Sequence, residues 1–253
     1  MLDQVLPANL FAALLVFARI GSAMLMLPGF GEAYVNPRLR LAFALALTVL
    51  AAPVLAPKLP AMPGTPLGLL TLMGGEIAVG LFLGTLTRVL LAALQVAGSV
   101  ISVQLGLSAA LIFNPLQQQQ EAITSTFLGV AGVLVIFLTD LDHAMLRALI
   151  HSYAVFEPGA PLEWGDLSAA MARATAESFR LGVEMAAPFM VMGTIFYVAV
   201  GLVSRLAPQL QILFATQPLQ IVAGLTAFAL LLASGLQWFL ERFATDLGQL
   251  LRG

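Results

Sequence analysis

Residues 67–113 read LGLLTLMGGEIAVGLFLGTLTRVLLAALQVAGSVISVQLGLSAALIF, an apolar stretch in which Glu76 and Arg88 are the only charged residues. About 20 predominantly apolar residues are enough for one helix to cross the hydrocarbon core of a membrane. The stretch is long enough for two such helices, although little turn chemistry indicates where a first helix would end and a second begin. The sequence therefore predicts a membrane protein built from apolar helices.

The rest of the chain has the same composition. Hydrophobic residues make up 60% of the 253 residues, charged residues 9%, and the mean hydropathy is +0.98. Soluble domains are nearer half apolar and a quarter charged. The formal net charge of −2 provides no basic patch, so nucleic acid is not an expected partner. The chain has no cysteine, which excludes disulfides, thiolate metal sites and a cysteine nucleophile.

Shorter apolar runs extend outward from the central stretch on both sides. The polar residues Asp140, Asp142 and His143 separate two runs that are each shorter than a full span, which predicts a hairpin or a broken helix. Farther on, Trp164 is a plausible interfacial anchor, and Asp166 is placed to cap a long helix. We predict an all-α integral membrane protein of about six spans, partly broken and arranged as helical hairpins, with the outer runs at 10–30, 41–56, 127–139, 144–155, 166–203 and 219–240.

The long helix after Asp166 carries charges of alternating sign along one face. Arg173, Glu177, Arg180 and Glu184 recur at offsets of four, three and four residues. Local ion pairs on a solvated half of the helix would explain them. Glu184, however, lies in the apolar part, where an ionisable side chain usually faces protein or a water-filled path. The stripe could therefore also face a partner subunit.

Residues with catalytic chemistry are scarce. His143 and His151 are eight positions apart, or roughly 12 Å along a continuous helix, which is too far to share one metal ion. The cluster of Asp140, Asp142 and His143 could bind a cation but is more typical of a solvated turn. The sequence contains no GxSxG, HExxH or Walker pattern. We therefore predict no enzyme activity, no metal and no cofactor.

Ionisable residues within the apolar runs leave two classes of protein open. Arg19, Glu76, Arg88 and Glu184 could form a proton or ion relay in a transporter, or could pair across helices in an assembly. The segment from Phe113 to Glu121 favours the assembly, because a proline and four glutamines interrupt two membrane-grade runs. Non-helical backbone at membrane depth is tolerated where it is buried in protein or lines a cavity. This segment is thus a candidate pore constriction.

Small residues also recur in the apolar runs. Gly80 and Gly84 form a GxxxG pair, and such residues let helices approach closely. Packing within the chain is the simpler explanation of these glycines, and it is compatible with an assembly. The other glycines in apolar sequence are Gly74, Gly75, Gly98, Gly106, Gly129 and Gly132.

Taken together and in order, these residues resemble the FliR family of the flagellar type III export apparatus and its injectisome relatives. The resemblance covers nearly the whole chain. Its N-terminal part comprises Arg19, Pro28, Gly29, the run Asn36-Pro37-Arg38-Leu39-Arg40-Leu41 and Pro53; its central part comprises Glu76, Gly80, Gly84, Gln95, Gly98, Gln104 and Gly106-Leu107-Ser108; its C-terminal part comprises Ala186-Ala187-Pro188, Arg205, Pro208-Gln209-Leu210-Gln211 and Pro218.

The resemblance implies a non-enzymatic subunit of a helical export gate in the bacterial inner membrane, at the flagellar basal body. It implies FliP-like and FliQ-like partner subunits, FlhA-like and FlhB-like export components, unfolded flagellar proteins as cargo, and contact with membrane lipid. Residues 1–253 would form one membrane domain, with 1–165 similar to FliP and 166–253 similar to the helical hairpin of FliQ.

The resemblance also implies a loop near 111–121 that plugs the closed pore. That loop comprises Leu111, Ile112, Phe113, Asn114, Pro115, Leu116, Gln117, Gln118, Gln119 and Gln120, with Ile112, Phe113 and Leu116 as apolar stoppers. The residues that we expect to be buried or to meet other subunits are Arg19, Arg38, Glu76, Arg88, Gln104, Glu184, Arg205, Gln209 and Gln211.

Three alternatives are kept. The chain could serve an injectisome rather than a flagellum, since the two systems differ mainly in genetic context. A proton-coupled secondary transporter has the same composition, but it would carry an internal repeat of broken helices that the sequence does not show. Solute uptake by this chain alone in liposomes would support that class. An intramembrane enzyme would depend on a single His or Asp.

Overall fold

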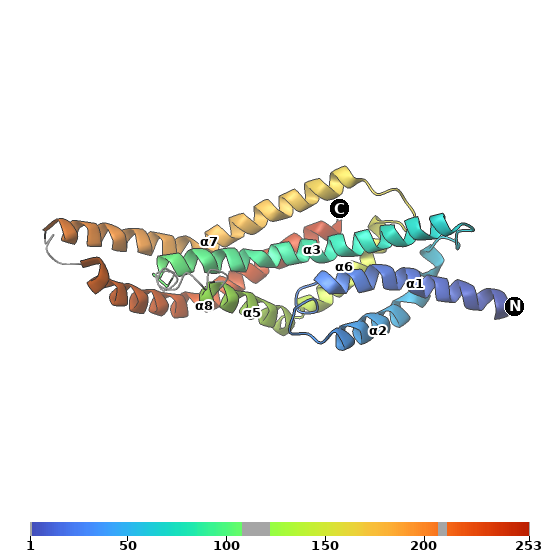
Figure 1. The fold of residues 1–253 in the computed structure, drawn as a ribbon, viewed down its shortest axis with the longest axis horizontal. Helices are drawn as coiled ribbons and strands as arrows, with labels where there is room; N and C mark the ends of the chain where they lie inside the picture. Colours follow the sequence, from blue (N-terminus) through green and yellow to red (C-terminus); the bar gives the residue numbers. More distant parts are fainter. Residues whose placement is uncertain (1, 108–121, 207–211, 253) are drawn as a thin grey trace. The chain divides into compact units, whose positions relative to one another are not determined.

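The computed structural model describes residues 2–107, 122–206 and 212–252, and these residues are almost entirely helical (Figure 1). The predicted plug loop at 111–121 and the residues Gln209 and Gln211 lie outside the described ranges. The helices are α1 (Leu2–Met26), α2 (Pro37–Leu55), the short 3-10 helix η1 (Ala56–Lys58), α3 (Pro66–Gln104), α5 (Ile123–Leu138), α6 (Leu141–Val155), α7 (Trp164–Leu206) and α8 (Ile212–Arg252).

The predicted number of membrane spans is confirmed. Among the described residues, five helices are long and apolar enough to cross a membrane, and α5 with α6 would make a sixth if the pair forms one bent span. The five candidate spans are Asn9–Met26, Pro37–Lys58, Pro66–Gln104, Trp164–Arg205 and Thr216–Asp246. The chain is therefore an all-α, multi-pass membrane protein.

The central apolar stretch forms one helix up to Gln104 rather than two. From the sequence, two helices were possible in the stretch that begins at residue 67. The structure instead has a single helix, α3, from Pro66 to Gln104. No proline lies inside it, and the paired glycines Gly74 and Gly75 cost about 1 kcal/mol each relative to alanine, which neighbouring apolar turns can offset. The expected second span in this stretch is thus the second half of α3.

The predicted broken helix is confirmed at Asp140. Helices α5 and α6 are bent by 77° at a short break. Asp140 occupies the left-handed region with φ 57°, a conformation that short polar side chains tolerate better than most. The polar residues at 140–143 therefore mark a sharp bend between two short apolar helices.

Two helix boundaries differ from the prediction. Helix α7 begins at Trp164, so Asp166 is not the N-cap but lies in the first turn, where a carboxylate still stabilises the positive end of the helix dipole. Helix α8 covers Ile212–Arg252, well beyond the predicted 219–240. Both helices continue through an internal proline, Pro188 in α7 and Pro218 in α8. Proline is tolerated in membrane helices, where local adjustments satisfy the freed backbone groups.

The chain divides into two compact units. Unit 1 comprises Met1–Leu90, Ile136–Ala174 and Ala244–Gly253, and unit 2 comprises Leu91–Val135 and Thr175–Phe243. Helices α3, α5, α7 and α8 each contribute residues to both units. The two units are described separately below.

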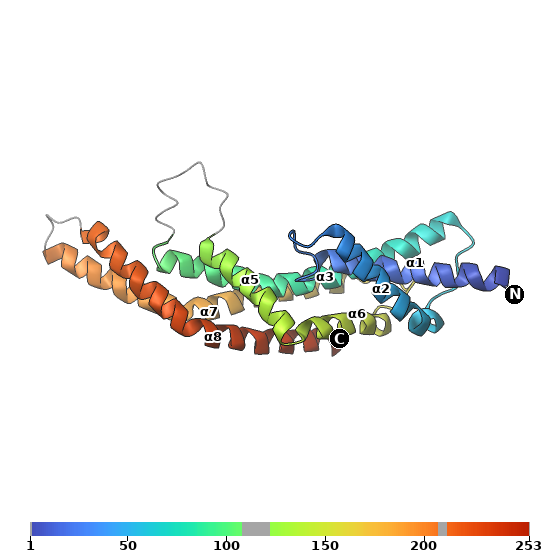
Figure 2. The same ribbon diagram turned by 90° about the horizontal axis from the view of Figure 1, so that it is seen from below.

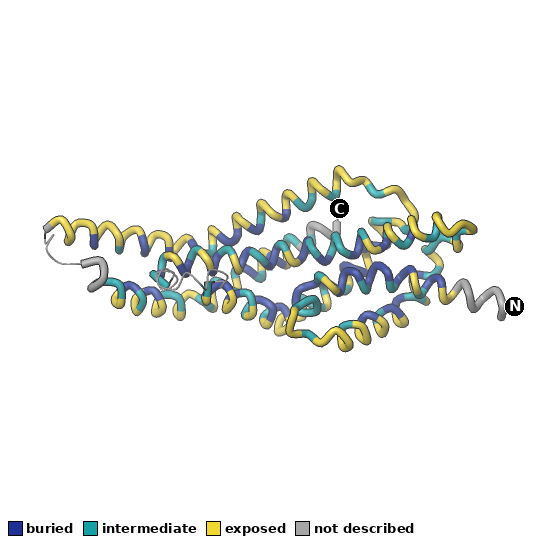
Figure 3. Tube along the Cα trace, viewed as in Figure 1, coloured by how far each residue is buried: buried dark blue, intermediate teal, exposed yellow. Residues whose placement is uncertain are grey.

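In unit 1, α1 packs against α2 and against the first part of α3. Phe11 and Leu15 of α1 and Leu72 of α3 form a buried apolar cluster. Farther along, the two helices approach so closely that a Cβ on Gly84 would lie 2.7 Å from the Ala23 carbonyl oxygen, and a Cβ on Gly80 would collide with the Arg19 carbonyl and the Ser22 hydroxyl. The GxxxG pair thus serves packing within the chain. Figure 3 shows buried positions along α1 and α3, and exposed positions along the outer face of α2.

The connection between α1 and α2 is fixed by its own polar groups. Gly29 adopts φ 80°, which favours glycine, and the Asn36 side chain caps α2 by accepting a hydrogen bond from the Arg38 backbone N–H at 2.9 Å. The Arg40 guanidinium donates to the carbonyls of Phe30 at 2.8 Å and Glu32 at 2.9 Å. The run from Asn36 to Leu41 therefore begins α2, and its Arg40 side chain stabilises the turn before the helix.

In unit 2, the second half of α3 packs against α5, α7 and α8, and α7 and α8 run side by side in both Figure 1 and Figure 2. A Cβ on Gly98 would collide with the backbone of Ser125 in α5, and a Cβ on Gly182 of α7 would lie 2.7 Å from Val96. The Thr124 hydroxyl donates to the Gly98 carbonyl at 2.6 Å. Unit 2 is thus held by small residues and side-chain hydrogen bonds to backbone carbonyls.

Candidate functional site

A buried ion pair forms the polar centre of unit 1. Arg19 of α1 and Glu76 of α3 are 0% and 2% exposed. The guanidinium donates to both carboxylate oxygens, from Nε at 2.7 Å and from Nη2 at 2.9 Å. This two-pronged geometry is the strong form of an arginine–carboxylate pair. The sequence predicted both residues as buried and polar, and the structure brings them together.

Helix α6 and its C-cap residue Phe156 complete this charge cluster, which we define as Arg19, Glu76, Ser152, Tyr153 and Phe156. Arg19 also donates to the Ser152 hydroxyl at 3.1 Å and to the Phe156 carbonyl at 2.8 Å. The Tyr153 ring lies 3.9 Å from the guanidinium carbon, which places the cation over an aromatic face. A buried charge is costly unless it is paired and fully hydrogen-bonded. The Arg19–Glu76 pair meets that condition through these hydrogen bonds, so it ties α1, α3 and α6 in one arrangement. The Tyr153 hydroxyl is buried without a hydrogen-bond partner among the described residues.

The polar centre of unit 2 is the C-terminal end of α3. Gly106 adopts φ 75°, and its N–H donates to the Val103 carbonyl at 3.1 Å, while the Leu107 N–H donates to the Ser102 carbonyl at 3.1 Å. These two bonds form a Schellman cap, in which a glycine in the left-handed conformation ends the helix. The cap leaves the Gln104 carbonyl, one of the last helical carbonyls, without a partner inside α3.

A side chain of α8 supplies that partner. Gln220, 6% exposed, donates from Nε2 to the Gln104 carbonyl at 2.8 Å and to the Tyr197 hydroxyl of α7 at 3.2 Å. The Gln104 side chain in turn lies against Gly193 of α7, where a Cβ would collide with it. We call Gln104, Gly106, Tyr197 and Gln220 the α3 cap. The cap joins the end of α3 to both α7 and α8.

Comparison with known proteins assigns the chain to a protein family. The family model of the bacterial export proteins, family 1, matches residues 10–245. Flagellar biosynthetic protein FliR of Caulobacter vibrioides is 34% identical over 235 residues, which cover 93% of this chain and 94% of that protein. This chain belongs to the FliR family of bacterial export proteins. FliR of Bacillus subtilis is 31% identical over 223 residues, covering 85% of this chain and 84% of that protein. Yop proteins translocation protein T of Yersinia pestis is 27% identical over 157 residues, covering 60% and 59%.

The two polar centres coincide with residues that carried the resemblance to the FliR family. Glu76, Gly80 and Gly84 lie on the face of α3 that meets α1, and Arg19 lies opposite Glu76. Gln104 and Gly106 form the α3 cap. These positions are occupied by residue types that the packing requires, because a larger or apolar side chain would separate the helices or leave a buried polar group unpaired.

The other predicted charged residues lie on the surface of their units. Arg38 is exposed in the first turn of α2, and Arg205 is exposed at the end of α7. Arg88, 46% exposed, approaches Glu32 at 3.9 Å, which is a weak surface pair. Glu184 is 43% exposed. None of these four lies in either polar centre of the described residues.

Three residues of the charged stripe on α7, Glu177, Arg180 and Glu184, lie in local contact with one another. Arg180 donates to one Glu177 oxygen from Nη2 at 2.5 Å and from Nε at 3.2 Å. Its distance to Glu184 is longer, 3.8 Å. The bend at Asp140 is similar in character, because His143 contacts Asp142 at 3.1 Å and is well exposed. Both groups are typical of solvated or interfacial surfaces.

Three important residues of the centres were not predicted from the sequence. Ser152 and Tyr153 lie in the short helix α6, and the sequence does not indicate which helices pack against it. Gln220 lies in the apolar run 219–240, which also contains Gln237. The signal for Gln220 was available, because an amide in a membrane-grade helix costs free energy unless it is hydrogen-bonded. Its partner could be found only from the folded chain.

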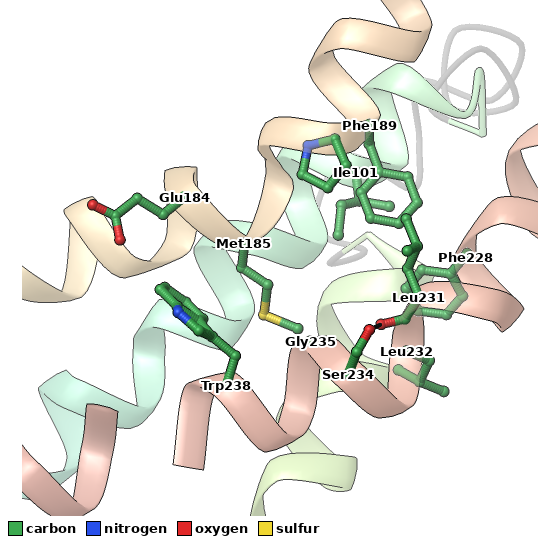
Figure 4. Close-up of a pocket in the computed structure, with 11 residues that line it drawn as sticks. Ile101, Glu184, Met185, Phe189, Phe228, Leu231, Leu232, Ser234, Gly235 and Trp238 are labelled. Carbon is green, nitrogen blue, oxygen red and sulfur yellow. Dashed lines mark hydrogen bonds between the residues drawn. The ribbon is translucent and has the colours of Figure 1, made fainter. Parts of the chain in front are cut away.

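Unit 2 also contains a narrow pocket between α7, α8 and α3, with a volume of about 280 Å³ (Figure 4). Its walls are apolar apart from Glu184 and Ser234. The pocket adjoins neither the α3 cap nor a cluster of catalytic side chains among the described residues. The hydrogen bonds of the two polar centres fix the register of the helices within each unit.

Proposed function

We propose that this chain is a non-enzymatic subunit of a bacterial type III protein export gate, in which it forms with FliP-like and FliQ-like subunits a channel for unfolded flagellar proteins. Membership of the FliR family supports the proposal. The proposed location is the bacterial inner membrane at the flagellar basal body, with FlhA-like and FlhB-like components as neighbours. Several apolar helices long enough to span a membrane are compatible with that location.

The length of α3 is the structural observation that best supports an assembly. Leu67 near its start is 71% exposed and Val103 near its end is 56% exposed. The 36 residues between them correspond to about 54 Å of helix, whereas the hydrocarbon core is about 30 Å thick. Even a tilt of about 40°, the upper end of the usual range, leaves about 41 Å along the membrane normal. One apolar end of α3 therefore lies outside the hydrocarbon core, where a partner subunit would cover it.

The resemblance to the FliR family suggests separate roles for parts of the chain. Residues 1–165 would correspond to a FliP-like portion, and 166–253 to a FliQ-like helical hairpin. The segment 111–121 would plug the closed pore, with Ile112, Phe113 and Leu116 as apolar stoppers and Gln117 to Gln120 as a polar face. Its position in the sequence supports this role, because it lies between the capped end of α3 and the start of α5. The exposed charges Arg38, Arg88, Glu184 and Arg205 would lie at surfaces that meet other subunits or lipid head groups.

Co-expression and co-purification test the proposal. We expect the full chain to co-purify in detergent with FliP-like and FliQ-like subunits of the same organism, and deletion of Asn114 to Gln120 to leave that complex intact. The deletion should raise the ion conductance of membranes that hold the closed gate. Replacing Gln117 to Gln120 by serine is the matched control, because it keeps the loop length and the apolar stoppers.

Different results would contradict the plug role of residues 111–121 and the gate role of the chain. Unchanged conductance of the deletion variant, with the complex intact, would contradict the plug. Failure of the wild-type chain to co-purify with either partner would contradict the gate role itself. Solute uptake by the chain alone in liposomes would support a transporter instead.

The similarity to Yop proteins translocation protein T favours one alternative, an injectisome gate in place of a flagellar one. Deleting the gene in its host distinguishes the two. Loss of motility with secretion of other proteins unchanged supports the flagellar system, and the opposite result supports the injectisome.

A further inference from the structure

The buried ion pair of unit 1 joins two helices that are far apart in the sequence. Arg19 lies in α1, and Glu76 lies in α3, 57 positions later. The other acceptors of the guanidinium, the Ser152 hydroxyl and the Phe156 carbonyl, lie 133 and 137 positions after Arg19. Arg19 is therefore synthesised well before any of the groups that bind it in the folded chain.

Arg19 lies near the middle of the first candidate span. The span Asn9–Met26 has ten residues before Arg19 and seven after it, and it contains eight leucine, isoleucine, phenylalanine and valine residues. An arginine at the centre of a membrane helix costs about as much free energy as seven such apolar residues contribute. As a single helix, α1 is therefore near the balance between insertion into a membrane and exclusion from it.

The acidic residues that precede Glu76 are poorly placed to offset this cost. The sequence before Glu76 contains two of them, Asp3 and Glu32. Asp3 lies 16 positions before Arg19, which is about 24 Å along α1. Glu32 lies beyond the end of α1 and approaches Arg88 instead. Glu76 is thus the first acidic residue within apolar sequence after Arg19, and it is the residue that binds the guanidinium.

The directions of α1 and α3 are compatible with pairing inside a membrane. Arg19 meets Glu76, and one turn farther along α1 Ala23 meets Gly80, so the two helices run parallel. Two helices that cross a membrane in the same direction need a helix between them that crosses back, and α2 occupies that place in the chain. The sequence of α2 after Arg40 contains no charged residue, so α2 can insert without an ionic partner.

We propose that α3 is the insertion partner of α1, so that α1 becomes a stable membrane span only when Glu76 binds Arg19. The two helices then enter the membrane as a pair, with the charge of each neutralised by the other. Ser152 and Phe156 complete the hydrogen bonds of the guanidinium when α6 follows. The inference does not rest on the export role, because the pair lies wholly within unit 1.

Cysteine labelling of the full-length chain in bacterial spheroplasts tests the proposal. The sequence has no cysteine, so a single cysteine introduced at Gln4 or at Ala33 is the only thiol. Gln4 precedes the span Asn9–Met26 and Ala33 follows it. A membrane-impermeant maleimide, added before or after permeabilisation, shows whether the two positions lie on opposite sides of the membrane. We expect opposite sides in nearly all wild-type molecules, because α1 then spans the membrane.

Variants of the ion pair separate insertion from packing. Glu76→Leu should place the two labelled positions on the same side in about half of the molecules, because α1 is then near its insertion balance. Arg19→Leu/Glu76→Leu should return them to opposite sides, since leucine in place of arginine favours insertion by at least about a hundredfold. Arg19→Leu alone should also keep them on opposite sides. Glu184→Leu is the matched control, because it removes an acidic residue from another candidate span and should leave α1 unaffected.

Opposite sides in nearly all Glu76→Leu molecules would overturn the proposal. So would a same-side fraction that persists in the double variant, because Glu76 would then act on α1 by a route other than Arg19. Labelling immediately after a pulse of synthesis prevents degradation of wrongly inserted chains from hiding them. The chain is expressed without other export components, so the outcome is independent of whether the gate assembles.

Discussion

Replacing Arg19 by methionine should destabilise the fold more than most single substitutions. Methionine keeps an unbranched apolar side chain in the site but removes the guanidinium. The Glu76 carboxylate, 2% exposed, then loses both of its short hydrogen bonds, and the Phe156 carbonyl loses its donor at 2.8 Å. Removing one partner of a buried pair costs about 3–5 kcal/mol, because the other charge is left buried. We expect the free energy of unfolding to fall by that amount.

The double variant Arg19→Met/Glu76→Leu should recover part of this loss. Both charges are then absent, and the Phe156 carbonyl is the main group left without its donor, which costs about 1–3 kcal/mol. The double variant is thus expected to be more stable than Arg19→Met alone by about 2 kcal/mol. Equilibrium unfolding in mixed micelles of dodecyl maltoside and sodium dodecyl sulfate, followed by circular dichroism, measures all the values.

Arg88→Met is the matched control for these substitutions. It removes an arginine from the same chain, but one that is 46% exposed and 3.9 Å from its acidic neighbour Glu32. Surface pairs of this kind contribute at most about 1 kcal/mol. The reasoning is refuted if Arg19→Met costs no more than the control, or if the double variant loses as much as the sum of its two single variants.

Other substitutions test the packing of unit 2. Gln220→Leu leaves the Gln104 carbonyl without its side-chain donor, so we expect a loss of about 1–3 kcal/mol in the same unfolding measurement; a neutral result would show that the cap does not depend on this bond. Gly98→Ala should cost about 1–3 kcal/mol, because its Cβ meets the Ser125 backbone. Gly74→Ala, whose Cβ meets nothing within 4 Å, should instead stabilise the helix by about 1 kcal/mol. Equal effects of the two glycine substitutions would contradict the packing argument.

The regular parts of the fold could be predicted from the sequence because each depends on local information. Run length alone identifies the spans, and a polar group in the middle of a short apolar run identifies the bend at Asp140. The continuity of α3 was not predictable in the same way. Two glycines and the charged Glu76 and Arg88 resemble helix ends, but only contacts with α1 show that Gly80 and Glu76 belong to a packed face.

The polar centres were predictable only in part, for a physical reason. Arg19 and Glu76 are identified as buried by their position in apolar sequence, since a charge there needs a partner. The identity of that partner depends on which helices adjoin, and several acidic residues were possible. Gln104 was identified from the resemblance, whereas its partner Gln220 lies 116 positions away in the sequence. Tertiary hydrogen bonds of that separation leave no periodic pattern.

The close contacts and the buried charges of unit 1 depend on one another. Lipid tails are as apolar as leucine, so apolar area alone does not select which helices pair in a membrane. Glu76, Gly80 and Gly84 recur every fourth residue on α3, opposite Arg19, Ser22 and Ala23 of α1. The glycines remove the side chains that would hold the helices apart, and the short approach permits the hydrogen bonds of 2.7 and 2.9 Å between Arg19 and Glu76. Those bonds in turn fix the register at which the glycines meet α1, since a shift of one turn would leave the two charges buried and unpaired.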